Sequence, residues 1–395
     1  MCSVINFKCP ACGKKSVEFL TDWHFSGLND SIFNYIAQFL SCTDCGLVYI
    51  ANITDGVLSR FYQDECCYFE KAHFDINALE NIRKYEAYQN ILRNFKLIDT
   101  PLTDVGCGRG GFLIWLQRNK WKANCTGVDF DMRSIPVEKK TQDKDLNKKE
   151  KISFQKGTAF SLPFSDRSQS MLCYFHVLEH IRDLDIVVQE ARRVIKDSGH
   201  ILIEVPDAER YHEFPVGTAF WFSIREHVNH FTGSALCKVL ERNGFSVKQV
   251  IRQELPTPEF SYPSLMVLAQ KWSKVELTAP PKMGNVGDFL LQSQRDLLKQ
   301  AEKFGNLNRS LETLTFWGCS AELFSLLPIL KIQNFAICDS SRIKQKSTYK
   351  KLPIQNPTKI PIAGKMIIAP YLHGEAIEKI AYELGWPKDS VSRLR

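Results

Sequence analysis

From residue 100 to residue 272 the chain alternates between short apolar runs and stretches whose apolar residues recur every three or four positions. The apolar runs predict strands over 102–105, 125–128, 152–155, 170–177, 200–205, 247–251 and 265–269. The amphipathic stretches predict helices over 78–94, 184–195 and 234–243, and one that begins at Phe112. The run 170–177 is apolar throughout, as in strands covered on both faces. This alternation predicts an α/β fold, a doubly wound parallel sheet with an antiparallel edge.

A second α/β unit follows a break in the pattern at 279–287, which reads APPKMGNVG. A long amphipathic helix is expected over 288–304, followed by a strand at 314–317, Gly318, a helix at 320–327 and a strand that ends on Asp339. A strand at 366–369 then precedes a helix at 375–384. This order repeats the strand, turn, helix, strand and acid of the central unit. Together with a cysteine-bearing N-terminal segment, it divides the chain into domains 1–68, 69–278 and 285–395.

Glycines dominate the link between the first two central strands. The strand 102–105 runs into Gly106, Gly108, Gly110 and Gly111, and the second strand ends on Asp129. Glycine lets backbone N–H groups approach a ligand, and an acid at a strand end can accept both hydroxyls of a ribose. The segment therefore predicts an adenosine-type cofactor. A dinucleotide fingerprint reads G-x-G-x-x-G, whereas here an additional glycine, Gly110, comes one position early.

Two C-x-x-C-G knuckles, CPACG and CTDCG, predict a metal site in the N-terminal segment. Cys9, Cys12, Cys42 and Cys45 would present four thiolates to one tetrahedral ion, in a closed and therefore structural Zn²⁺ site. The 29 residues between the knuckles exceed the commonest zinc spacings, so unrelated reduced cysteine pairs or redox motifs remain as alternatives. The ion would supply folding energy to a segment too small to hold a core. The spare cysteines Cys2, Cys66 and Cys67 are assigned no role.

Composition narrows the class of protein. The chain has 395 residues, of which 44% are hydrophobic, and a net charge of +7. No apolar run is long enough to span a bilayer and the polar N-terminus is no signal peptide, so we expect a soluble, cytoplasmic protein without a membrane partner. The lysine-rich run 138–151 has a net charge of only +2, because its six lysines are interspersed with four acidic residues. It lacks aromatic residues and predicts a solvated insertion rather than a nucleic-acid surface. The thirteen cysteines do not predict disulfides, because four are spaced for a metal and most others lie in apolar strands.

The spacing D-x-G-x-G-x-G, which adds Asp104 to the glycines, resembles the first motif of class I S-adenosylmethionine (SAM) methyltransferases. Later segments are similar to the successive motifs of that family, in the same order: GVDFD, GTAFSLPFSD, YFHVLEHIRDL, RRVIKDSGHILIEVPD and REHVNHFTGSALCKVLERNGF. Asp104 can accept hydrogen bonds from the turn's own N–H groups. The resemblance implies SAM as the cofactor, with Asp129 at its ribose, Ala159 and Phe160 near its adenine, and Phe175 and His176 lining its pocket. Phe130, next to Asp129, is also assigned to cofactor binding. Core roles for Phe160 and Phe175 remain as alternatives.

Methyl transfer to an alcohol or an enolate also needs a base that removes a proton. Glu179 and His180 end the fourth strand, although such a pair also caps helices. The second cluster, REHVNHF, follows the fifth strand and holds three titratable groups within five positions: Glu226, His227 and His230. We therefore assign the base to His227 or His180, with Glu226 orienting it or shuttling the proton.

A zinc ribbon ahead of such a domain resembles an arrangement among small-molecule and sugar methyltransferases. FWGCSAE and ICDSS are similar to segments of the C-terminal domain of sugar C-methyltransferases, which contacts the nucleotide of an NDP-sugar. The chain departs from that family at Ile224 and Arg225, where a tyrosine is expected, and at TPEFSYP, where a glycine–serine loop is expected. The resemblance implies C-methylation of a nucleotide-linked ketosugar by a monomer or dimer. Alternatives are a SAM-dependent O-methyltransferase of a sugar or other metabolite, a non-catalytic scaffold, and a C-terminal domain that only packs or dimerises.

Overall fold

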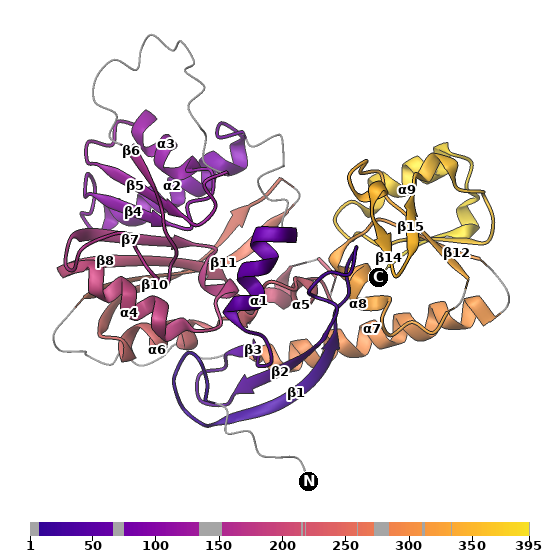
Figure 1. The fold of residues 1–395 in the computed structure, drawn as a ribbon, viewed down its shortest axis with the longest axis horizontal. Coiled ribbons are helices and arrows are strands. Elements are labelled where there is room, and N and C mark those ends of the chain that lie inside the picture. Colours follow the sequence, from indigo (N-terminus) through magenta and orange to yellow (C-terminus); the bar gives the residue numbers. More distant parts are fainter. Residues whose placement is uncertain are drawn as a thin grey trace.

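The computed structural model of the protein describes residues 8–65, 75–133, 152–214, 216–217, 219–258, 260–271, 284–309, 313–332 and 334–394. Cys2, Cys66, Cys67 and the charged run 138–151 lie outside these residues, as does 279–283 of the expected linker. Three sheets organise the described chain. In the view of Figure 1 the central and C-terminal sheets lie on opposite sides of the molecule, and the N-terminal sheet lies below and between them.

The central sheet has seven strands in the order β10-β11-β8-β7-β4-β5-β6. Their bounds are β4 Leu102–Val105, β5 Cys125–Asp129, β6 Ile152–Lys156, β7 Gln169–Phe175, β8 Ile195–Pro206, β10 Phe245–Pro256 and β11 Ser261–Lys271. The five strands from β6 to β8 are parallel, whereas β11 is antiparallel to both β8 and β10. The predicted α/β class is thus confirmed. The chain reverses its direction of travel across the sheet between β4 and β7, and a ligand crevice is expected at the carboxyl ends of those strands.

Strand limits were predicted less well at the antiparallel edge. β8 begins at Ile195, not at residue 200, because Ile195 pairs with Gln169 beyond an irregularity in the ladder. β10 continues to Pro256, past the predicted end at 251. It is an edge strand, so its polar residues face solvent and the apolar pattern fades before the hydrogen-bonded ladder ends.

Helices cover the central sheet: α2 Leu79–Asn94, α3 Gly111–Arg118, α4 Leu184–Val194, the short α5 Phe220–Ser223 and α6 Gly233–Arg242. The buried residues of α4 recur at helical spacing: Leu184, Val187, Val188, Ala191 and Val194. α6 begins at Thr232, whose hydroxyl accepts a hydrogen bond from the Ala235 N–H at 3.0 Å. The spacing of the buried residues and the N-cap therefore agree with the helices predicted for this region.

The N-terminal sheet contains a strand from a distant part of the chain. Its order is β1 (Val17–His24), β2 (Ile36–Cys42), β3 (Val48–Ile50) and β9 (Asn229–His230), all antiparallel. α1 (Asp55–Arg60) and the π-helical turn η1 (Phe61–Glu65) follow β3. The N-terminal sheet therefore crosses the predicted domain boundary near residue 68, since β9 comes from the central part of the chain and extends that sheet.

The C-terminal sheet has the order β14-β15-β13-β12-β16-β17. Its strands are β12 Leu314–Trp317, β13 Phe335–Cys338, β14 Thr348–Tyr349, β15 Leu352–Gln355, β16 Lys365–Ile368 and β17 Val391–Arg393. The helices are α7 Val286–Arg309, α8 Ala321–Leu326 and α9 Gly374–Glu383. Taken in chain order, the parallel strands β12, β13, β15, β16 and β17 are arranged like β4 to β8, with the first strand in the middle. The sheet is Rossmann-like, and the short strands β14, β15 and β17 were not predicted.

The N-terminal sheet contacts the C-terminal unit directly. The Trp23 indole N–H donates to Ser325 Oγ at 3.1 Å, the Ser26 hydroxyl donates to the Phe324 carbonyl at 2.7 Å, and Gln294 Nε2 on α7 donates to the Asp22 carbonyl at 2.7 Å. The N-terminal sheet therefore touches both of the larger units. Among the described helices, none combines the length and the apolarity needed to cross a membrane.

Candidate functional site

The glycine turn adopts the conformations that its sequence suggests. Gly106, Gly108 and Gly110 have φ angles of 74°, 52° and 67°, the left-handed region that favours glycine. A Cβ on Gly106 would lie 2.6 Å from Val177 Cγ2, and one on Gly110 would lie 2.5 Å from the Phe154 ring. Gly106 and Gly110 are therefore fixed by packing as well as by φ.

Two buried carboxyl groups lie at the turn. Asp129 accepts hydrogen bonds from the Gly108 N–H at 2.8 Å and the Asp131 N–H at 2.9 Å. Burial nevertheless raises its pKa. Asp104 is 4% exposed, and burial together with the nearby charge of Asp129 raises its pKa to about 8. The Gly106 N–H donates to the Val128 carbonyl at 2.8 Å. The Gly110 N–H donates to the Cys107 carbonyl at 2.9 Å. Among the described residues, the recorded acceptors for the glycine N–H groups of the turn are thus Val128, Asp129 and Cys107, whereas Asp104 was expected.

A cavity of about 450 Å³ opens beside Asp129, at the ends of β5 and β6. It is lined by Gln63, Phe130, Asp131, Arg133, Lys156, Gly157, Thr158 and Ser161. Ala159 and Phe160 lie in the same loop, between the bridge partners Thr158 and Ser161, and are partly buried against the core. The cavity therefore adjoins the positions assigned to the ribose and the adenine.

Phe175 lies on the opposite side of β4. Its ring stacks on Tyr88 with centroids 4.0 Å apart and meets Phe112 edge-on at 5.4 Å. These contacts make Phe175 part of an aromatic cluster beneath α2, as expected if Phe175 is a core residue. Its role at the cofactor stays a prediction.

His176 and Glu204 form a charged pair that sequence reasoning missed. His176 has a left-handed φ of 56°, and its Nε2 lies 2.7 Å from the Tyr262 hydroxyl and 3.3 Å from Glu204 Oε2. Burial alone lowers the pKa of His176, but the charge of Glu204 and hydrogen bonds to Glu179 and Glu204 outweigh it and raise that pKa to about 10. The two carboxylates that face His176 therefore favour its protonated form.

Glu204 is fully buried in β8 and is surrounded by donors. Tyr88 and Tyr262 donate to its two carboxylate oxygens at 2.9 Å and 2.7 Å, and Ser264 donates at 2.9 Å. Burial opposes ionisation, yet the His176 charge and the hydrogen bonds lower the pKa of Glu204 to about 2. An acid inside the apolar run ILIEVP was the one signal of this role in the sequence.

Glu179, His180 and His227 come together at the ends of β7 and the 224–227 loop. The His180 and His227 rings are 4.8 Å apart, and Glu179 Oε1 lies 3.8 Å from His180 Nε2 and 2.9 Å from His176 Nδ1. Within the described chain, the buried atoms Glu179 Oε2 and His227 Nδ1 have no hydrogen-bond partner. Burial, then the nearby charges of His180, His230 and His176, lower the pKa of His227 well below its usual value. The cluster can accept a proton, and its ligand atoms, all within 4.8 Å of one another, also meet the distance condition for a cation.

Glu226 meets this cluster through its main chain. His180 Nδ1 lies 3.0 Å from the Glu226 carbonyl and 2.9 Å from the Tyr62 hydroxyl. Because a carbonyl only accepts, this contact favours a proton on Nδ1 and leaves Nε2 as the basic atom. The carboxylate recorded beside the imidazoles is that of Glu179, and orientation by the Glu226 carboxylate stays a prediction. The Tyr62 ring also meets the Phe130 ring edge-on, with centroids 5.9 Å apart. Tyr62 therefore contacts both His180 and a residue that lines the 450 Å³ cavity.

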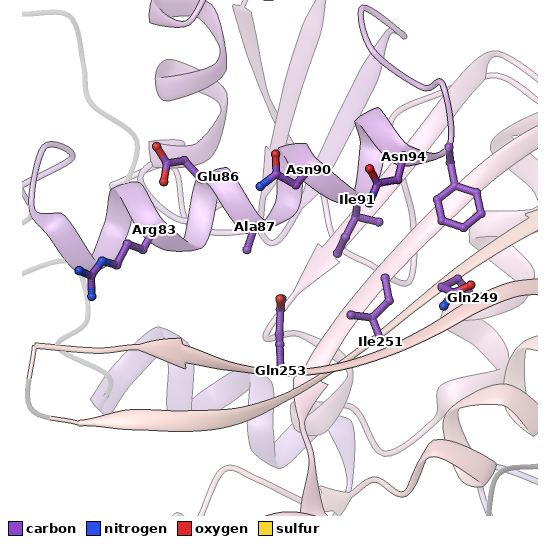
Figure 2. A pocket seen from close by; sticks show the side chains of 10 residues that line it. Arg83, Glu86, Ala87, Asn90, Ile91, Asn94, Gln249, Ile251 and Gln253 are labelled. Carbon is purple, nitrogen blue, oxygen red and sulfur yellow. The ribbon is translucent and has the colours of Figure 1, made fainter.

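A second cavity, of about 620 Å³, lies elsewhere. Figure 2 shows it between α2 and β10, with polar side chains from both elements, among them Arg83, Glu86, Asn90, Gln249 and Gln253. It is separate from the glycine turn and contains none of the residues assigned to the cofactor or to catalysis.

The four cysteines form a compact cluster. Cys9 Sγ lies 3.5 Å from Cys45 Sγ, Cys12 Sγ lies 3.5 Å from Cys42 Sγ, and all four sulfurs lie within 4.8 Å of one another. Gly13 and Gly46, which follow the second cysteine of each knuckle, have φ angles of 74° and 75°. Four largely buried sulfurs at this separation fit a tetrahedral ion with Zn–S bonds of about 2.3 Å.

Comparison with known proteins agrees with this architecture. Residues 79–250 match the family model described as a methyltransferase domain. The matched part of the chain contains most of the central sheet. It includes every element from α2 to most of β10, and so the glycine turn, Asp129, His176 and the Glu179 cluster.

Individual curated relatives match about a quarter of this chain. The uncharacterized methyltransferase YcgJ of Bacillus subtilis is 33% identical over 101 residues, or 25% of this chain and 38% of that protein. Ajmaline N-methyltransferase of Rauvolfia serpentina is 26% identical over 102 residues, covering 26% of this chain and 34% of that protein. The chain therefore spans less than half the length of these relatives. The crystal structure of YcgJ has 18% identity, covers 48% of this chain and 100% of that one, and gives a TM-score of 0.39.

Proposed function

We propose that this protein binds SAM at the carboxyl end of β4 and transfers its methyl group to a small molecule. The match of residues 79–250 to a methyltransferase domain carries the proposal. The left-handed glycines and the buried carboxylate of Asp129 fit the ligand, because they combine a close backbone approach with acceptors for ribose hydroxyls. SAM, when bound, supplies a methyl group on a positively charged sulfur, so the chain must mainly align the acceptor.

The acceptor that we favour is a nucleotide-linked ketosugar, methylated on carbon. Support comes from the C-terminal unit, which repeats the crevice geometry. The Cys319 N–H donates to Asp339 Oδ2 at 2.7 Å and the Ser341 N–H donates to Oδ1 at 2.8 Å, matching the bonds to Asp129 within about 0.1 Å. Gly318 has a φ of 104°. A carboxylate held in this way at a strand end can accept ribose hydroxyls of a second nucleotide.

The Glu179, His180 and His227 cluster would take the proton from the carbon next to the ketone. His180 Nε2 and His227 Nδ1 are the two basic atoms without a hydrogen donor recorded against them in the described chain. Glu179 faces His180 at 3.8 Å and would stabilise an imidazolium once it forms. The main-chain carbonyl of Glu226 would orient His180, and the Glu226 carboxylate would shuttle the proton.

We further propose that Cys9, Cys12, Cys42 and Cys45 hold a structural Zn²⁺. The sulfur separations and the burial of three of the four cysteines support it. The site offers no open position, so the ion would stabilise the fold and take no part in the chemistry.

Two measurements test the proposal. Titration calorimetry should give one SAM per chain, and SAM should raise the melting temperature. Incubation of a 4-keto nucleotide sugar in deuterated water should place deuterium on the adjacent carbon. His227→Gln should reduce that exchange, whereas His24→Gln, a change on β1 in the N-terminal sheet, should not.

The outcomes separate the alternatives. SAM binding without solvent exchange, but with a methylated oxygen in the product, would favour the O-methyltransferase. The absence of SAM binding would favour a scaffold, in which the N-terminal and C-terminal units recruit partners. Exchange that disappears on treatment with a chelator, while the four-cysteine ion is retained, would assign a cation to the cluster in place of a base.

A further inference from the structure

The four-cysteine cluster and the methyl-transfer site share a segment of backbone, residues 228–232. β9 leaves the central unit immediately after His227 and Val228, and pairs with β3 through His230 with Val48 and Asn229 with Tyr49. The Ile50 N–H donates to the Val228 carbonyl at 2.9 Å. β3 itself begins three residues after Cys45. The segment next to the candidate base is thus a strand of the sheet that adjoins the four cysteines.

The opposite side of the same segment is bound to the turn that carries Glu179 and His180. The Val228 N–H donates to the Glu179 carbonyl at 2.8 Å. The Asn229 amide donates to the Leu178 and Ile181 carbonyls at 3.2 Å and 2.6 Å, and Asn229 is 1% exposed. β9 therefore fixes the two imidazoles relative to each other, because it binds the N-terminal sheet on one side and the 178–181 turn on the other.

Three side chains bind the knuckles directly. The Thr232 hydroxyl donates to the Cys45 carbonyl at 2.6 Å, and Thr232 is fully buried. Lys238 donates to the Asp44 carbonyl at 2.9 Å, and Arg242 donates to the Pro10 carbonyl at 2.9 Å. All three accepting carbonyls belong to the knuckle loops, whose conformation four thiolates around one ion would fix.

From these contacts we infer that the four-cysteine ion controls the geometry of the acceptor side of the site, through Thr232 and β9, while leaving the SAM side unaffected. This inference rests on the proposed function for the meaning of the site, but the coupling itself does not depend on methyl transfer. Thr232 is a positioning residue: it touches the knuckle and the start of α6, and acts on His227 through β9. The recorded bonds of the glycine turn, from Gly106 and Gly108 to Val128 and Asp129, lie wholly within the central sheet and should persist.

The test is hydrogen exchange of the full chain, followed by mass spectrometry, with and without Zn²⁺. Removal of the ion with a chelator should speed exchange at 226–231 and 48–50 by about 10-fold or more, and leave 102–110 unchanged. SAM affinity should change by less than about 2-fold. Equal protection of 226–231 in both states would overturn the inference, as would an equal loss of protection at 102–110.

Thr232 variants test the route while the ion stays bound. Thr232→Val should speed exchange at 226–231 and release of the ion to a chromophoric chelator, whereas Thr232→Ser, which keeps the donor, should behave as the wild type. The control is Thr54→Val, which removes another threonine N-cap: Thr54 accepts a hydrogen bond from the Val57 N–H at the start of α1. It should change neither the exchange at 226–231 nor the release of the ion. A Thr232→Val protein with wild-type exchange at 226–231 would overturn the route. Ion-dependent protection in a chain that does not bind SAM would refute the methyltransferase function and leave the coupling intact.

Discussion

Asp104→Asn should stabilise the free protein while weakening the cofactor site. Asp104 is enclosed in β4, and burial together with Asp129 raises its pKa to about 8 from an ordinary value of 3.8. Asparagine has nearly the same shape and no charge to bury. The substitution therefore removes the cost of ionising the group without leaving a void.

The size of the effect follows from proton linkage. Between about pH 4 and pH 8 the unfolded chain has lost the Asp104 proton and the folded chain still holds it, so the wild-type free energy of unfolding falls as the pH rises. Each pKa unit corresponds to about 1.4 kcal/mol, so a shift of about four units sets an upper limit of roughly 6 kcal/mol. We expect Asp104→Asn to be more stable than the wild type by about 2–5 kcal/mol at pH 8, and by less than about 1 kcal/mol at pH 4.

Urea unfolding of both proteins at several pH values between 4.5 and 8 measures this difference. Asp22→Asn, a change at an exposed carboxyl on β1, is the control. Its difference from the wild type in free energy of unfolding should not grow as the pH rises. Calorimetry above about pH 8, where the wild-type Asp104 is ionised, should show SAM binding about 10-fold or more weaker in Asp104→Asn, because a cationic ligand loses a nearby carboxylate. At about pH 6, where the wild-type group holds its proton, the two affinities should differ little. A stability difference that stays constant with pH would refute the linkage argument, and unchanged SAM affinity would remove Asp104 from the cofactor site.

Other changes test separate parts of the structure. Gly106→Ala forces a left-handed φ of 74° and a Cβ 2.6 Å from Val177, and should cost about 1–3 kcal/mol in urea unfolding and reduce SAM binding; full retention of both would contradict the strained turn. Glu204→Gln removes one of the two buried carboxylates that face the His176 cation, the other being Glu179, and should cost about 2–3 kcal/mol, against about 1 kcal/mol for the control Tyr88→Phe, which removes one donor. Similar losses in the two variants would mean that the hydroxyl hydrogen bonds, and not the charge pair, supply the stability. Glu179→Gln should slow solvent exchange into a ketosugar by about 10²-fold or more without changing SAM affinity, and an unaltered rate would exclude Glu179 from proton transfer. Cys42→Ser, or removal of metal by a chelator, should lower the melting temperature along with the zinc content measured by mass spectrometry, and a metal-free chain with wild-type stability would exclude a structural ion.

Short-range features of this protein could be predicted from the sequence alone. β4 and β12 begin and end where their apolar runs do, because both strands are covered on both faces and every residue is buried. The glycine positions specify left-handed φ angles, and the paired C-x-x-C-G knuckles specify a cysteine cluster, since each depends on a few consecutive residues. The α/β class follows from the alternation of these local patterns.

The composition of the site was decided by tertiary structure. Tyr62 meets His180 across 118 positions, and Tyr88 meets Glu204 across 116. β9, two residues long, pairs with β3, which lies about 180 residues earlier in the chain, and no local periodicity predicts that pairing. Periodicity shows that a side chain is buried, but the partner that meets it depends on how distant segments pack. For that reason the sequence predicted that the site lies at the carboxyl ends of the strands. Only the tertiary structure shows that Glu179 is the carboxylate beside the imidazoles and that His176 pairs with Glu204.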